Sequence, residues 1–249
     1  MAFNISLVKQ IIGGPSDFGI GWIVILLASV IAILATIVTC WKWISTRLKE
    51  KDRFLQMAAQ LDTGAHISYF ISVLGNPVSI SPNEAATQEY IFVNKYFYVQ
   101  AVTNPDGGVS LFSVTTRRKD FKPVLKSQFG QVLVVLGETT FSRLANPKKR
   151  RFSGDHGGIT FYSESCYFGY DGSYRMYFFS TNPNGLGSLP MVPASFVEMG
   201  EEDAADLERF RTEAIINTYT ISTLSGPNGD ENVPSHTIFG PKTYQVRVF

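Results

Sequence analysis

The longest apolar stretch of the chain lies near its beginning and carries no charged side chain. It runs from Phe18 to Trp41 as FGIGWIVILLASVIAILATIVTCW, 24 residues in all. As an α-helix rising about 1.5 Å per residue it would extend about 36 Å, enough to cross a bilayer with some tilt. We therefore expect a transmembrane helix over residues 18–44, preceded by an N-terminal tail at 1–17. A cleaved signal peptide is the alternative, but its apolar run is shorter and a small-residue cleavage motif follows it.

The residues that flank this stretch predict its orientation. All three tryptophans, Trp22, Trp41 and Trp43, lie near its ends, where an indole ring prefers the membrane interface, so we expect them to be interface anchors. Only Lys9 is basic before the stretch, whereas five basic residues follow it, and the positive-inside rule places the more basic side in the cytoplasm. We expect a single-pass protein of the inner membrane with a cytoplasmic body. The five basic residues are Lys42, Arg47, Lys49, Lys51 and Arg53.

Helical periodicity continues after the apolar stretch. Residues 45–61 repeat apolar side chains at i, i+3 and i+4, which predicts a juxtamembrane helix that Ser45 or Thr46 could cap. A second, shorter helix is expected to end at Gly75, which supplies a backbone conformation with positive φ. Pro77 then prevents the helix from continuing.

The pattern next changes from helical to alternating. Segments 89–93, 95–103 and 108–116 are rich in aromatic and β-branched residues, which predicts three strands. The sequence NPDGG at 104–108 is typical of a turn between two of them. We therefore expect a module of helix and antiparallel sheet over residues 62–122.

A similar pattern recurs about sixty residues later. HISYFISVLGNPVSI stops its apolar run at Leu-Gly75, and QFGQVLVVLGETTFS stops at Leu-Gly137. The second run predicts a helix over 125–136, and we interpret residues 123–181 as a second module stacked on the first, so that both bury one core. A chance recurrence of a common helix ending is the alternative. The strands expected in this second module are 158–165, 166–170 and 173–181.

The pattern over the remaining residues, 182–249, is less regular. Segment 201–219 has an acidic first turn and an apolar face, which predicts a helix. TYQVRVF at 243–249 alternates and predicts a last strand. The expected fold class is α+β, with one N-terminal transmembrane helix followed by a soluble body of two helix-plus-antiparallel-sheet modules.

Composition and charge narrow the classes of protein. The chain has 22 Lys and Arg against 21 Asp and Glu, a net charge of +1, which argues against a nucleic-acid partner. Cys40 lies in the apolar stretch and Cys166 in a predicted strand, so we expect no disulfide between them, as in a reducing compartment. Aromatic residues make up 13% of the chain, which favours sheet over a helical bundle.

The sequence lacks the common motifs of catalysis and metal binding. His66, His156 and His236 are far apart, and neither a His-x-x-x-His nor a Cys-x-x-Cys spacing occurs. Asp155 and His156 are adjacent and cannot easily form the line of nucleophile, base and orienting group, and no G-x-S-x-G motif is present. Phosphate-binding and dinucleotide-binding glycine motifs are also missing. We therefore expect no catalytic residue, no metal and no cofactor.

Two basic clusters are the candidate contact sites. TRRKDFK at 116–122 closes the first module, and KKRRFSGDHGG at 148–158 is expected as a loop inserted into the second. Such side chains bind anionic lipid headgroups, with about 1 kcal/mol for each charge near the surface, or an acidic partner or phosphate. A solvated loop without a ligand is the alternative. The candidate residues are Arg117, Arg118, Lys119, Lys148, Lys149, Arg150 and Arg151.

The first module resembles known small modules. A helix ending in LG-x-P, followed by Y-x-F and a hairpin closing on D-x-G-V, is similar to the modules of outer-membrane assembly lipoproteins and to the tandem modules of β-lactamase inhibitor proteins. The chain also resembles a group of uncharacterised membrane-anchored bacterial proteins. The resemblance covers residues 62–116, and over 125–181 it continues with Thr139 in place of the proline. The matching residues are Leu74, Gly75, Pro77, Tyr90, Phe92, Asp106, Gly108 and Val109.

The resemblance implies a protein-binding scaffold, since those families carry no catalytic residues. Our first hypothesis is therefore a membrane-anchored, non-catalytic scaffold or regulatory module that binds an unknown protein partner beside the lipid bilayer. The second is a membrane-surface enzyme that acts on a lipid or phosphorylated substrate and grips phosphate with Arg117, Arg118 and residues 148–151. The third is an envelope assembly or inhibitor protein with a periplasmic body. A grooved apolar-aromatic face favours the scaffold, and a pocket with convergent polar groups favours the enzyme.

Overall fold

The computed structural model of the chain describes residues 18–82, 87–126, 132–144, 149–155, 158–168, 175–187, 204–223 and 239–246. The predicted N-terminal tail at 1–17 lies outside these residues. The chain divides into two units, residues 1–52 and residues 53–249, and each is described by itself.

Helix α2 (Phe18–Ala59) contains the whole predicted transmembrane stretch. From Trp22 to Leu48 its apolar side chains are exposed, and these include the aromatic rings of Trp41 and Trp43 near the predicted end of the span. The Arg47 guanidinium lies 5.2 Å from the centre of the Trp43 ring, a cation–π contact. By length and composition α2 is able to cross a membrane, which makes it a candidate membrane-spanning helix.

The predicted boundary between a membrane helix and a separate helix at 45–61 is absent. Helix α2 continues without interruption to Ala59. The Ser45 and Thr46 hydroxyls donate hydrogen bonds to the Lys42 carbonyl at 2.9 and 2.8 Å, so they bond back along the same helix and do not cap a new one. The residues of α2 that follow Asp52 belong to the second unit.

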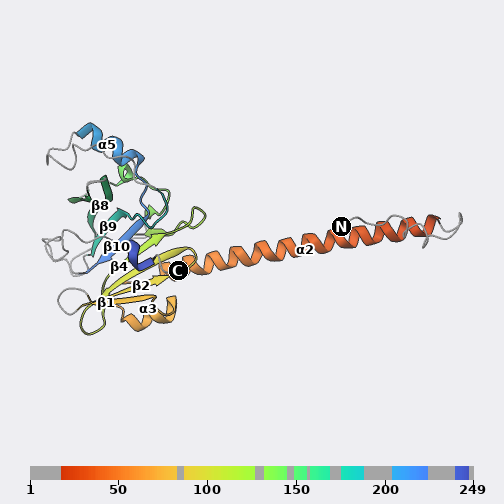
Figure 1. Cartoon of the computed structure of the whole chain (residues 1–249), viewed down its shortest axis with the longest axis horizontal. Coiled ribbons are helices and arrows are strands. Elements are labelled where there is room, and N and C mark those ends of the chain that lie inside the picture. Colours follow the sequence, from red (N-terminus) through yellow and green to blue (C-terminus); the bar gives the residue numbers. More distant parts are fainter. Residues whose placement is uncertain are drawn as a thin grey trace. The chain divides into compact units, whose positions relative to one another are not determined.

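In the described part of the second unit, eight antiparallel strands form one sheet in the order β1-β2-β3-β4-β10-β9-β8-β7 (Figure 1). A separate hairpin joins β5 (Val124–Lys126) to β6 (Val132–Val135). This mixture of helix and antiparallel sheet confirms the predicted α+β class. The strands of the large sheet are β1 (Ser79–Pro82), β2 (Gln88–Val93), β3 (Phe97–Thr103), β4 (Val109–Thr116), β7 (Lys149–Asp155), β8 (Gly158–Phe168), β9 (Arg175–Thr181) and β10 (Thr218–Ser222).

The first half of the body follows the prediction closely. Helix α3 (Ile67–Leu74) ends at Gly75, whose N–H donates to the Ile71 carbonyl at 2.9 Å. The φ angle of Gly75 is +86°, a conformation that glycine adopts without the strain of a side chain. Strands β2, β3 and β4 coincide with the three predicted strands to within two residues. In Figure 1, α3 lies at the β1 end of the sheet.

The helix predicted over 125–136 is wrong. This segment overlaps β5 and contains β6, which pair antiparallel with Val124 opposite Val135 and with a register shift between Leu125 and Lys126. A short run of buried apolar residues looks alike in a helix and in a strand, and the run of valines favours the extended form. Gly137 has a φ of +76°, but it follows a strand and ends no helix. The repeat of a helix ending at Leu-Gly is therefore absent. Apart from the hairpin of β5 and β6, the described strands of both predicted modules join one sheet.

Strands at the far end of the sheet differ from the prediction in two ways. The two segments expected at 158–165 and 166–170 form the single strand β8. The basic segment expected as a loop forms β7, the last strand of the described sheet, which pairs with β8. Lys148 and residues 156–157 lie outside the described residues.

The C-terminal segment holds the largest error. The helix predicted over 201–219 is only α5 (Ala204–Glu213), which lies near β8 in Figure 1. Strand β10 follows it and runs between β4 and β9, so that it joins the two halves of the sheet. The short helix α6 (Thr243–Val246) stands where a last strand was predicted, and residues 247–249 lie outside the described part.

The two faces of the sheet have different chemistry. One is apolar, with Val99, Val114, Tyr219 and Phe179 in one cross-strand row. The opposite face is rich in hydroxyl and amide side chains, and residues 239–246 pack against it. For example, the Gly240 N–H donates to Gln100 at 2.7 Å and the Gln245 amide donates to Glu89 at 2.7 Å. Residues 239–246 thus cover part of the polar face, and the side chains of the apolar face form the main buried core of the body.

Candidate functional site

A cleft of about 860 Å³ opens on the apolar face of the sheet. One wall is the end of α2 together with the residues that follow it, 55–62, and the other is the segment 122–126, which includes β5. Strands β4, β9 and β10 form its floor. All of these residues belong to the second unit. Pockets that hold small molecules have volumes of about 300–1,000 Å³, so the cleft has the size of a ligand site.

The floor of the cleft is aromatic and aliphatic because of the register of three strands. Phe112 on β4 pairs with Ile221 on β10, which pairs in turn with Tyr177 on β9. Residues opposite each other in a sheet share a face, so these side chains form one apolar surface, and Tyr219 continues it. Burial raises the pKa of the Tyr177 and Tyr219 hydroxyls. Both tyrosines therefore stay neutral at physiological pH.

Each wall turns some apolar side chains inward and leaves others at the opening. On the α2 side, Ala58 is buried against the core while Ala59 is exposed. On the hairpin side, Leu125 is 7% exposed, whereas Val124 is 44% exposed. Because side chains alternate along a strand, Val124 and Lys126 lie on the same face of β5, opposite to Leu125. The opening is therefore lined by an apolar side chain and a cationic one.

Ion pairs occupy part of the rim of the cleft. The Arg175 guanidinium binds both carboxylate oxygens of Asp62, one of them at 3.1 Å. Lys122 Nζ lies 2.7 Å from Glu138 Oε2, and this hydrogen bond and the lysine charge lower the pKa of Glu138. In the described part of the chain, Lys126 forms no ion pair. The rim thus carries three cationic residues, two of which are paired with carboxylates.

The predicted basic residues that follow β4 do not reach this cleft. The Arg117 guanidinium lies 4.4 Å from the centre of the Tyr98 ring and donates to the Asn94 carbonyl. Arg118 forms an ion pair with Asp120 at 3.0 Å. Lys119 is exposed. Arg117 and Arg118 therefore make contacts within the protein, and none of the three residues lines the cleft.

The second predicted cluster lies at the edge of the sheet. Lys149, Arg150 and Arg151 begin strand β7, and Arg150 Nε lies 3.8 Å from Glu164 Oε1. Strands β10, β9 and β8 separate β7 from β4 in the sheet. Three strands therefore lie between the two basic clusters, which do not form one site.

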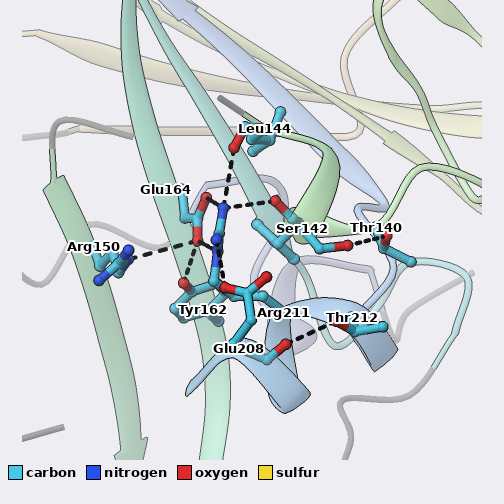
Figure 2. A network of polar contacts seen from close by, with 10 residues as sticks. Thr140, Ser142, Leu144, Arg150, Tyr162, Glu164, Glu208, Arg211 and Thr212 are labelled. Atoms are coloured by element: carbon cyan, nitrogen blue, oxygen red, sulfur yellow. Dashed lines mark hydrogen bonds and ion pairs between the residues drawn. The ribbon is translucent and has the colours of Figure 1, made fainter. Parts of the chain in front are cut away.

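A buried charge network lies beside this edge. Glu164 on β8 is fully buried and faces Arg211 on α5, with 2.7 Å between Glu164 Oε1 and Arg211 Nε (Figure 2). The Arg211 guanidinium also donates to the carbonyls of Phe141 and Leu144 at 2.9 and 3.1 Å. Figure 2 shows the guanidinium between the Glu164 carboxylate and the Leu144 carbonyl. The Tyr162 hydroxyl donates to Glu164. Every charged group at the centre of the network thus has a partner.

The network is built to hold elements together. Burial lowers the pKa of Arg211, but its hydrogen bond to Glu164 and the charge of that residue outweigh this effect and leave the pKa raised. Burial, and to a lesser extent the Glu164 charge, raises the pKa of the Cys166 thiol to about 11, so that Cys166 remains an unreactive thiol. Removal of either charge would leave the other buried without its main partner. We therefore assign Glu164 and Arg211 to the docking of α5 on β8.

The sequence contains two features that could have indicated this network but that the search for catalytic and metal-binding motifs does not detect. Glu164 lies between Tyr162 and Cys166 at every second position of a strand, so a charge stands on an apolar face. Arg211 likewise follows Leu207 by four residues on the apolar face of α5. The cleft had no comparable signal, because its lining comes from separate segments of the chain.

Comparisons with known proteins identify no match for the chain. A scan against protein-family models finds no match, and searches of curated proteins and of solved structures find none either. The resemblance to lipoprotein and inhibitor modules therefore stays a prediction. Among the described residues, no three His, Cys, Asp or Glu side chains gather as a metal site would require. The fold thus defines an α+β protein with a candidate membrane-spanning helix and an apolar cleft.

Proposed function

We propose that this protein is a single-pass membrane protein whose body is a non-catalytic binding module that acts as a scaffold or regulator. Helix α2 would anchor it in the inner membrane, and the body would bind its ligand in the cleft between α2, β5 and the sheet. The excess of basic residues after the apolar stretch supports a cytoplasmic position for the body.

The cleft carries this proposal. Phe112, Tyr177 and Tyr219 give it an aromatic floor that is already fixed by the sheet, so a ligand would find the surface preformed. An enzyme site would need polar groups that converge on one reacting position. Here the polar groups at the rim engage one another, as Arg175 engages Asp62 and Lys122 engages Glu138. The arrangement therefore favours binding over catalysis.

Affinity purification from membranes in mild detergent tests the proposal. Ala59 is exposed at the opening, so Ala59→Trp would fill the cleft without overpacking the core. We expect mass spectrometry to find a protein or lipid that copurifies with the wild type and is depleted in Ala59→Trp. Ala205→Trp, at an exposed position of α5, is the matched control and should retain that species. Equal recovery from all three proteins would contradict binding in the cleft.

A further inference from the structure

The chemistry of the opening identifies a class of ligand. We propose that the cleft binds a single-chain anionic lipid drawn from the membrane, of which a long-chain fatty acid is the simplest. This inference rests on the proposed binding function of the cleft and names its ligand. The acyl chain would lie in the cleft against the exposed side chains of Val124 and Ala59, and the carboxylate would face Lys126 with Lys122 beside it.

The shape of the cleft favours a slender chain. Its volume of about 860 Å³ is within the range of small-molecule sites, but its floor offers little free surface, since Phe112 is 0% and Ile221 is 6% exposed. A partner helix would need a broad apolar stripe to rest on, with anchors at i, i+3, i+4 and i+7. Val124 is the one large hydrophobic residue of the described lining that is strongly exposed. An acyl chain needs less exposed apolar surface than a helix does, and the exposed side chains of Val124 and Ala59 at the opening supply such a surface.

The distribution of charge favours an anionic end group. Three cationic side chains line the cleft, Lys122, Lys126 and Arg175, against one carboxylate, Asp62. Arg175 is held by Asp62 and Lys122 by Glu138, whereas Lys126 forms no ion pair in the described part of the chain. Lys126 is exposed on the same face of β5 as Val124. An apolar side chain thus stands beside an available cation, which matches an amphiphile that is apolar along its length and negative at its end.

The covalent connection to α2 makes such a ligand available. The cleft wall begins at Leu55, in the same helix as the candidate membrane span. A protein that is anchored in a bilayer meets single-chain lipids continuously, because they partition into the membrane that holds it. A cytosolic peptide would have to reach the same opening by diffusion.

Photolabelling of the full-length protein tests the inference. The protein would be placed in nanodiscs of zwitterionic phosphatidylcholine together with palmitic acid that carries a diazirine on its chain. After illumination, mass spectrometry would compare the label on residues 55–61 and 124–126 with the label on the apolar part of α2, which reports the probe in the bilayer. We expect cleft labelling that excess palmitate removes and that an equal amount of hexadecanol, an uncharged chain of the same length, leaves largely in place.

Three variants complete the experiment. Lys126→Gln should weaken cleft labelling about fivefold, as expected from the loss of one exposed charge contact. Arg209→Gln removes an exposed charge on α5 and should change nothing. Ala59→Trp should abolish cleft labelling while the label on α2 persists. Unchanged labelling in Lys126→Gln, or equal competition by hexadecanol, would overturn the anionic end group.

The outcomes also separate this inference from the proposed function. Cleft labelling no stronger than that of Ala59→Trp would overturn the lipid ligand. If a protein still copurified with the wild type and not with Ala59→Trp, the binding function would stand with a protein as its ligand. If Ala59→Trp changed neither the copurifying species nor the photolabelling, both the binding function and the lipid ligand would be wrong.

Discussion

Arg211 and Glu164 stabilise the body although they do not line the cleft. Both are buried, and each supplies the main charge partner of the other. Their hydrogen bonds reach Tyr162 and the carbonyls of Phe141 and Leu144, so that β8, α5 and the turn at 141–143 are joined at one point. At the residue scale, this end of the body is held by one buried ion pair, which Arg150 and Glu208 extend at its margins.

Replacement of Arg211 by Met should therefore destabilise the body by about 3–5 kcal/mol, because Glu164 would remain buried without its main charge partner. Arg209→Met, on the exposed side of the same helix, should cost less than about 1 kcal/mol. The double variant Glu164→Leu with Arg211→Met should recover much of the loss, since apolar replacement of both charges is often tolerated. All tryptophans lie in α2, so tryptophan fluorescence would not report on the body. Denaturation should therefore be followed by near-ultraviolet circular dichroism, to which the tyrosines of the body contribute. A stable Arg211→Met protein would show that the pair contributes little.

Gly75 and Gly137 have backbone conformations in which a side chain is strained, and substitution at each position tests this strain. Their φ angles are +86° and +76°, and a side chain in that region is strained by about 1–3 kcal/mol. Gly75→Ala should therefore lower the free energy of unfolding by strain alone, since an added Cβ would meet no atom within 4 Å. Gly137→Ala should cost more, because the Cβ would also lie 3.2 Å from Leu186. Gly108→Ala lacks a positive φ and is the control. Equal denaturation midpoints for all three would rule out backbone strain at these turns.

At the scale of elements, local patterns predicted the first half of the body better than the second. Strands β2 to β4 follow one another through tight connections, so alternation and turn residues in one segment were enough to identify them. Strand β10 pairs with β4 and β9, which are distant in sequence, and no glycine or proline separates it from α5. Its position is decided by long-range pairing, which periodicity does not record. The cleft could not be predicted for the same reason.

The end of α2, which is a candidate membrane-spanning helix, is also part of the core of the body, together with the residues that follow it. Phe54 lies 5.1 Å from the ring of Tyr96, and Ala58 and Leu61 are buried. A protein beginning at residue 46 should therefore be soluble and folded, with native near-ultraviolet circular dichroism. A protein beginning at residue 62 loses these side chains and should be destabilised by about 5 kcal/mol or more, as for the loss of several core residues. If the longer fragment aggregated, the body would depend on the membrane helix for its folding.

At the scale of the whole molecule, the proposed function requires α2 to span the membrane with the body on the cytoplasmic side. The basic residues from Lys42 to Arg53 favour the cytoplasm. A reporter fused after Phe249 should therefore be active only if it works in the cytoplasm. Gln at Arg47, Lys49, Lys51 and Arg53, combined with new lysines near Asn4, should invert part of the population. A periplasmic signal from the unmodified protein would favour the envelope protein instead.

Cysteine labelling gives an independent check of topology if the position is chosen by exposure. Cys166 is buried and its thiol has a raised pKa, so its failure to react would say nothing about the compartment. Ile80 is 57% exposed, and Ile80→Cys supplies an accessible thiol. We expect a membrane-impermeant reagent to label it in opened cells and to leave it unlabelled in intact cells.

Binding in the cleft is tested most directly by photo-crosslinking in living cells. A photoreactive amino acid would be placed in turn at Val124, Ile80 and Tyr244, which are apolar and 44%, 57% and 68% exposed. Only Val124 lines the cleft. We predict a protein or lipid adduct at Val124 that disappears when Ala59→Trp fills the cleft, and no such Ala59→Trp-sensitive adduct at the other two positions. The absence of an adduct at Val124, or an adduct that persists in Ala59→Trp, would contradict a ligand in the cleft.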